Sequence, residues 1–230
     1  FDWEGVIDSL EQQRAVLTGA RARQLKYSDD EIAMFEAEWW RDCDDRVLRP
    51  ALKRVLDRRA PLLHRLQMAV LGLVVADNYH RRSEAERIDR VVESLEVATP
   101  REANERSKAR LIYHTAFGSL DAAIAAGMQL VKAERRSGNS PALFQALRWL
   151  SLPLCRADDL DGAVALLTEA YEHASRLGLR GEMWNAAYSL AGVALDCEKL
   201  NLALEWAPIV AALAQDATAR VLRESDHHYT

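Results

Sequence analysis

The sequence repeats itself at an interval of 40 residues over positions 99–217, and this periodicity constrains the fold more than any other feature. Residues of the same type recur at matched positions in three successive segments. The two clearest series are Leu120, Leu160, Leu200 and Ala123, Ala163, Ala203. A single segment of this kind cannot cover its own apolar face, so the repetition predicts a stack in which neighbouring segments bury one another.

Each 40-residue segment is predicted to form two helices joined by a tight turn. Gly138 and Gly178 follow the second helices, where glycine takes the left-handed conformation that ends a helix. Thr99-Pro100 opens the first segment, because proline suits the first helical turn. The predicted first helices span 100–117, 141–157 and 181–197, their partners span 119–136, 159–177 and 200–215, and an earlier, degraded pair spans 61–78 and 83–97.

The residues at 160–170, Leu-Asp-Gly-Ala-Val-Ala-Leu-Leu-Thr-Glu-Ala, and the Leu-Gly pair at 177–178 resemble a tetratricopeptide repeat. The 40-residue period resembles the slightly long variant of large bacterial transcriptional activators and related signalling proteins. Two features depart from the family: leucine replaces the usual aromatic residue of the turn, and the capping proline is absent. The resemblance implies an all-α fold, a right-handed α-solenoid of antiparallel helical hairpins. Its repeats would span 61–98, 99–138, 139–178 and 179–217, with a polar tail to residue 230.

Composition agrees with an all-α chain and excludes several functions. Proline and glycine number only 6 and 10, so long stretches lack helix breakers. The net charge of −5 gives no reason to expect nucleic-acid binding. The longest apolar run, 68–76, is far shorter than the roughly 20 residues that span a bilayer, so no membrane contact is expected. The cysteines Cys43, Cys155 and Cys197 are odd in number and far apart, which indicates neither a disulfide framework nor a zinc site and favours a cytoplasmic protein.

Residues 1–60 show no clear repeat and are predicted to be irregular helices that cap the stack, the alternative being the end of a preceding domain. One or two helices are expected at 3–25 and a long helical stretch at 29–58, with Pro50 interrupting the latter near Leu48. Adjacent residues cannot share a helix face, so Trp39 is predicted to lie in the core and Trp40 to remain a candidate contact.

No catalytic motif is present: the sequence has no glycine-rich phosphate loop, no His-Glu-x-x-His pair and no nucleophile elbow. The protein is therefore predicted not to be an enzyme and to need no cofactor or metal. Isolated helical histidines such as His114 and His173 are interpreted as structural. The acidic residues Asp42, Asp44 and Asp45 could suggest a cation site, but neighbouring helix residues point in different directions, which favours a solvated face.

The candidate binding residues come from the repeat geometry. In tetratricopeptide arrays the first helices line the concave surface, so polar pairs at one place in consecutive repeats would form a ribbon for a protein or an extended peptide. The predicted partner-binding residues are Glu105, Lys108, Gln145, Arg148, Asn185 and Tyr188, with Ile112, Leu152 and Gly192 deeper along the same helices. The alternative is an ordinary hydrated surface.

These features together predict a protein-interaction or sensory module of a larger bacterial signalling protein. Among such proteins, a transcriptional regulator is the leading prediction. The transcriptional role follows from the family resemblance and not from residue chemistry. Two alternatives stay open: the regulatory segment of a signalling enzyme, such as a nucleotide cyclase, and a free-standing scaffold or adaptor. The sequence also leaves open whether the stack forms a homo-oligomer.

Overall fold

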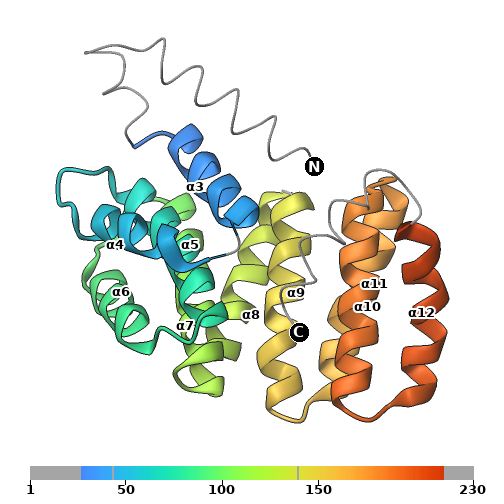
Figure 1. Ribbon diagram of the computed structural model, residues 1–230. Coiled ribbons are helices and arrows are strands. Elements are labelled where there is room, and N and C mark those ends of the chain that lie inside the picture. The colour runs from blue at the N-terminus through green and yellow to red at the C-terminus, as the bar shows by residue number, and fades with distance from the viewer. Residues whose placement is uncertain (1–26, 43, 139, 215–230) are drawn as a thin grey trace. The chain divides into compact units, whose positions relative to one another are not determined.

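The computed structural model describes residues 27–42, 44–138 and 140–214, and every regular element in these ranges is helical, as predicted (Figure 1). The elements are α3 (Asp29–Asp42), the 3-10 turn η1 (Asp45–Val47), α4 (Leu48–Leu56), α5 (Leu62–Asn78), α6 (Arg82–Ser94), α7 (Pro100–Ala116), α8 (Leu120–Ser137), α9 (Ser140–Arg156), α10 (Leu160–Arg176), α11 (Arg180–Asp196) and α12 (Leu200–Ala214). The chain divides into two compact units, with the boundary in the sequence between Phe117 and Gly118. The predicted helix at 3–25 and the tail beyond 214 lie outside the described residues.

The predicted helix boundaries from residue 61 onward are confirmed to within a few residues. Helices α7, α9 and α11 begin at Pro100, Ser140 and Arg180, and α8, α10 and α12 begin at Leu120, Leu160 and Leu200. The earlier pair is present as α5 and α6. These boundaries could be read from the sequence because helix ends are set by local capping chemistry.

The predicted start and stop residues act as expected. Thr99 accepts a hydrogen bond from the Glu102 backbone N–H, and the Glu102 carboxylate accepts one from the Thr99 N–H in return, which completes a capping box. Gly138 and Gly178 have φ values of +71° and +67°, in the left-handed region that favours glycine. Glycine therefore ends α8 and closes the turn after α10.

The helical stretch predicted at 29–58 is two helices separated by η1. At the start of α3, the Glu31 N–H donates a hydrogen bond to Ser28 Oγ, and the Tyr27 N–H donates one to Glu31 Oε2. These two backbone donors at the N-terminus of the helix therefore both have side-chain acceptors. The new helix begins at Leu48, where the interruption was predicted. Pro50 lies in the first turn of α4, a position at which proline removes no intrahelical hydrogen bond.

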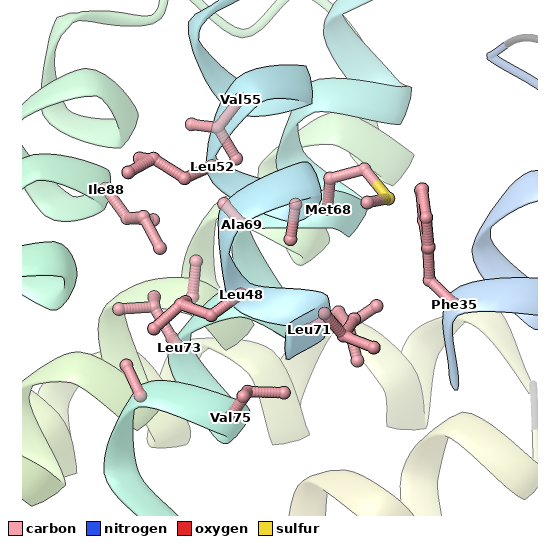
Figure 2. Packing of buried hydrophobic residues seen from close by; sticks show 14 of the residues in the cluster. Phe35, Leu48, Leu52, Val55, Met68, Ala69, Leu71, Leu73, Val75 and Ile88 are labelled. Carbon is pink, nitrogen blue, oxygen red and sulfur yellow. The ribbon is translucent and has the colours of Figure 1, made fainter. Parts of the chain in front are cut away.

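The first unit is built around α5, which contacts α3, α4, α6 and α7. Figure 2 shows Met68 and Leu71 lying toward Phe35 of α3, with Leu52 of α4 and Ile88 of α6 on the other side. Trp39 is 6% exposed and belongs to this core, which confirms its predicted burial. Helix α5 has buried residues on most of its faces, because other helices surround it. Its apolar residues therefore do not form a single stripe along one face.

In the second unit each helix from α8 to α12 packs against the next (Figure 1). Ala123, Ala163 and Ala203 are buried, as predicted, and their small side chains let neighbouring helices approach. The predicted burial of the matching leucines is only partly correct. Leu120 and Leu160 are partly buried, whereas Leu200 is 63% exposed, because α12 is followed by no described helix that could cover it. No described helix combines the length and apolarity that a bilayer span requires.

Candidate functional site

The second unit brings part of the predicted binding residues together on two helices. Helices α9 and α11 contact each other directly, although α10 lies between them in the chain. Gln145, Arg148 and Leu152 follow one another at helical spacing on α9, and Asn185, Tyr188 and Gly192 have the same spacing on α11. We call these six residues the α9–α11 face.

The α9–α11 face combines polar and apolar groups that reach solvent. Gln145 is exposed, Leu152 is 48% exposed and Tyr188 is 41% exposed, while Arg148 and Asn185 are partly buried. A Cβ added at Gly192 would meet no atom within 4 Å, so the surface of α11 is open at this point. An open position and an exposed leucine at equivalent places of neighbouring helices leave room for an apolar side chain of a partner.

Tyr188 is held in place by the tryptophan one turn before it. The two rings stack with centroids 5.0 Å apart and planes 15° apart. Trp184 is only 2% exposed and packs with Leu213 and Ala214 of α12. A stacked aromatic ring has little conformational freedom left to lose, so the Tyr188 ring is preorganised.

The other predicted pair, Glu105 and Lys108, lies on α7 in the first unit and has a different environment. Lys108 Nζ lies 2.7 Å from Glu105 Oε1, and each side chain is only 13% exposed. Burial, followed by the charge of Glu105, raises the pKa of Glu36 on α3. The pair thus offers little exposed surface to a partner. This low exposure does not support the predicted role of Glu105 and Lys108 in binding. The deeper residue Ile112 packs against the core of the same unit.

The acidic residues Asp42, Asp44 and Asp45 each interact with an arginine. Arg46 is paired with both Asp42 and Asp44, and Arg81 is paired with Asp45. Asp44 also accepts a hydrogen bond from the Arg46 backbone N–H and caps η1. Among the described residues no group of three His, Cys, Asp or Glu side chains is placed to hold a metal ion. The side chain of Trp40 lies outside the described part of the chain.

A buried polar cluster at the start of α3 was not predicted. Glu31, 8% exposed, lies 2.6 Å from Arg54 Nη2 of α4. His64 Nε2 of α5 lies 3.2 Å from Glu31 Oε2. Burial by itself raises the pKa of Glu31, but His64, Arg54 and the Tyr27 N–H together outweigh it and lower the pKa to about 2. No spacing in the sequence signals this cluster, because its members come from three helices.

A pair of thiols was also not predicted. Cys155 Sγ and Cys197 Sγ lie 3.3 Å apart, although the two residues are separated by 42 positions in the sequence. Both thiols are free, so no disulfide is present here, but their separation in the sequence does not keep them apart in space. The signal was present in the repeat, since a separation close to one 40-residue period places two residues at nearly equivalent points of neighbouring repeats.

No protein-family model matches this chain, and the comparisons with curated proteins and with solved structures also found no match.

Proposed function

We propose that the chain is a protein-interaction module of a larger bacterial signalling protein, a transcriptional regulator, built from tetratricopeptide-like hairpins in a right-handed α-solenoid. Its partner is an extended peptide segment that binds along the α9–α11 face. The observation that carries this proposal is the direct contact between α9 and α11, which brings side chains 40 residues apart in the sequence onto neighbouring helices. Solenoids commonly bind partners through such rows of equivalent positions.

The turns of the second unit support a repeating structure. Asp158 and Glu198 both take positive φ values, +65° and +58°, in the turns that precede α10 and α12. Each is followed by a residue whose N–H reaches back to the preceding helix: Asp159 donates to the Leu154 carbonyl at 2.9 Å and Lys199 to the Ala194 carbonyl at 2.7 Å. Successive repeats account for the recurrence of this turn after 40 residues, although the left-handed turn itself is a common helix ending that His80 and Gly178 also adopt.

The chemistry of the α9–α11 face favours an acidic peptide that carries an apolar side chain. The planar guanidinium of Arg148 is suited to a carboxylate, because it can donate two parallel hydrogen bonds. Leu152 and the open position at Gly192 provide an apolar contact. Tyr188 adds a fixed aromatic ring and a hydroxyl group. A peptide with a carboxylate a few residues from a leucine or a phenylalanine would engage all three features.

The test uses a displayed library of random peptides, selected for binding to the full 230-residue chain. The selected sequences should be enriched in Asp or Glu near a large apolar residue. Arg148→Ala and Leu152→Ala should each weaken a selected peptide about fivefold or more, which corresponds to about 1 kcal/mol. Tyr188→Phe, which keeps the stacked ring, reports on the hydroxyl group separately.

Leu177→Ala is the matched control, because Leu177 is 50% exposed but lies at the end of α10, a helix that contributes no residue to the α9–α11 face. It should leave peptide affinity unchanged. Peptides that bind equally well to wild type, Arg148→Ala and Leu152→Ala would place the binding site elsewhere. A library that yields no binding sequence at all would count against a peptide-binding module.

A further inference from the structure

Two cysteine thiols meet where α9 and α11 end. Cys155 lies in the last turn of α9, and Cys197 is the residue that caps the C-terminus of α11. Their sulfur atoms are 3.3 Å apart, both thiols are free, and both residues are partly exposed to solvent. Neither residue belongs to the α9–α11 face, although Cys155 lies one turn beyond Leu152 on the same helix.

We propose that Cys155 and Cys197 are a modification site at which a low-molecular-weight disulfide, such as oxidised glutathione, converts the two thiols into an intramolecular disulfide that joins α9 to α11. The inference rests on the thiol geometry alone and stands whether or not the α9–α11 face binds a peptide. It requires no movement of distant segments, because both sulfur atoms already lie in contact.

The chemistry is ordinary thiol–disulfide exchange. One thiolate attacks a sulfur atom of oxidised glutathione, forming a mixed disulfide and releasing one molecule of glutathione. The second thiolate then attacks the cysteine sulfur of that mixed disulfide and releases the second glutathione. The protein loses two protons and two electrons, and one oxidised glutathione becomes two reduced ones.

The geometry suits the second step better than it suits a stable mixed disulfide. A disulfide bond is about 2.05 Å long, so the sulfur atoms must approach by little more than 1 Å. Helices α9 and α11 already contact each other, so side-chain rotation can close this distance. A glutathione attached to either residue would have the other thiol beside it, and the intramolecular attack would expel it.

The surroundings of Cys155 set the speed of the reaction. Burial, followed by the hydrogen bond and the charge interaction with Cys197 and then the charge of Asp196, raises the pKa of Cys155 to about 11, while Arg156 acts in the opposite direction. Cys155 packs against the buried apolar cluster that includes Ala163, Leu190 and Val193. Because only thiolates attack disulfides, the exchange should be slow at neutral pH and faster as the pH rises.

The test begins with the fully reduced 230-residue chain, incubated with excess oxidised glutathione and then digested with trypsin without reduction. Cleavage after arginine and lysine leaves the three cysteines on separate peptides, 149–156, 181–199 and 42–46. The expected result is a linked pair of peptides 149–156 and 181–199, and an intact protein about 2 Da lighter. The oxidised protein should also melt about 5 °C higher, since the link closes a loop in the unfolded chain.

Cys43→Ser is the matched control and should leave both the linked peptides and the rise in melting temperature unchanged. Cys155→Ser and Cys197→Ser should each abolish both, and each should retain glutathione on the remaining thiol. Stable glutathione adducts on wild-type Cys155 or Cys197 would overturn the proposal, as would a link through peptide 42–46 or no reaction. The wild-type peptide map decides the matter even if a serine variant folds poorly.

Discussion

At the scale of single residues, Glu31 joins three helices through one carboxylate. It caps α3 through the Tyr27 N–H, pairs with Arg54 of α4 and lies against His64 of α5. Removing one partner of a buried ion pair leaves the other charge uncompensated, which costs more than the pair itself contributes. Arg54 is 19% exposed, so it cannot simply turn into water.

Glu31→Gln should therefore destabilise the protein at neutral pH by about 2–3 kcal/mol. The wild-type contribution has a defined pH window, because the folded pKa of about 2 lies below the ordinary value of 4.5. This contribution to the free energy of unfolding is fully present above about pH 4.5 and is lost as the pH falls toward 2. The difference between the two pKa values limits it to about 3 kcal/mol. Urea unfolding at several pH values checks this, with the exposed Glu96→Gln as control. A difference between wild type and Glu31→Gln that stays constant from pH 7 to pH 2 would contradict it.

Ala163 shows how little space separates the helices of the second unit. It is fully buried and belongs to a cluster with Leu167 of its own helix and Leu190 and Val193 of α11. Ala163→Leu should overpack this cluster and cost about 1–3 kcal/mol. Ala165 lies on the exposed side of the same helix, so Ala165→Leu should change stability by less than about 0.5 kcal/mol. Equal urea midpoints for the two variants would show that α10 packs differently.

At the scale of helices, two glycines of the second unit have opposite roles. Gly178 takes a φ of +67°, which an alanine adopts only at a cost. Gly192 lies inside α11 with ordinary helical geometry, and a Cβ there would meet nothing within 4 Å. Gly178 is needed for the turn, whereas Gly192 weakens its helix by leaving the backbone more freedom in the unfolded state.

Replacing glycine by alanine should consequently change the stability of the protein in opposite directions at positions 178 and 192. Gly178→Ala should destabilise by about 1 kcal/mol, and Gly192→Ala should stabilise by up to about 1 kcal/mol. Thermal unfolding of the two variants beside wild type measures the sign directly. A stabilising Gly178→Ala would mean that the turn after α10 is not left-handed. Gly192→Ala would also fill part of the α9–α11 face, so its peptide affinity should fall although its stability rises.

At the scale of the whole molecule, the chain consists of two compact units with separate cores. The partners of Glu31 lie on α4 and α5, and those of Ala163 lie on α10 and α11. Hydrogen exchange followed by mass spectrometry should therefore show Glu31→Gln raising exchange mainly within 27–117 and Ala163→Leu mainly within 118–214. If either substitution raises exchange equally in both ranges, the two units open as one.

The helices of both units were predictable because their ends carry local signals. The Thr99–Glu102 capping box and the glycines at 138 and 178 act through hydrogen bonds and backbone angles within a few residues. The exposure of the candidate site was predictable only in part. Gln145 and Tyr188 reach solvent as expected, while Glu105 and Lys108 are largely buried, since the burial of a polar face depends on what packs over it.

The sequence by itself determined the helical class, the helix boundaries and the buried alanines, because propensity, capping and 40-residue spacing are properties of the chain read in order. Only the tertiary structure decided which side chains meet. It placed Cys155 against Cys197 and assembled Glu31, Arg54 and His64 from three helices. Contacts of this kind depend on the angle and depth at which helices pack, and these follow from the combined shape of many side chains, not from the spacing of any few.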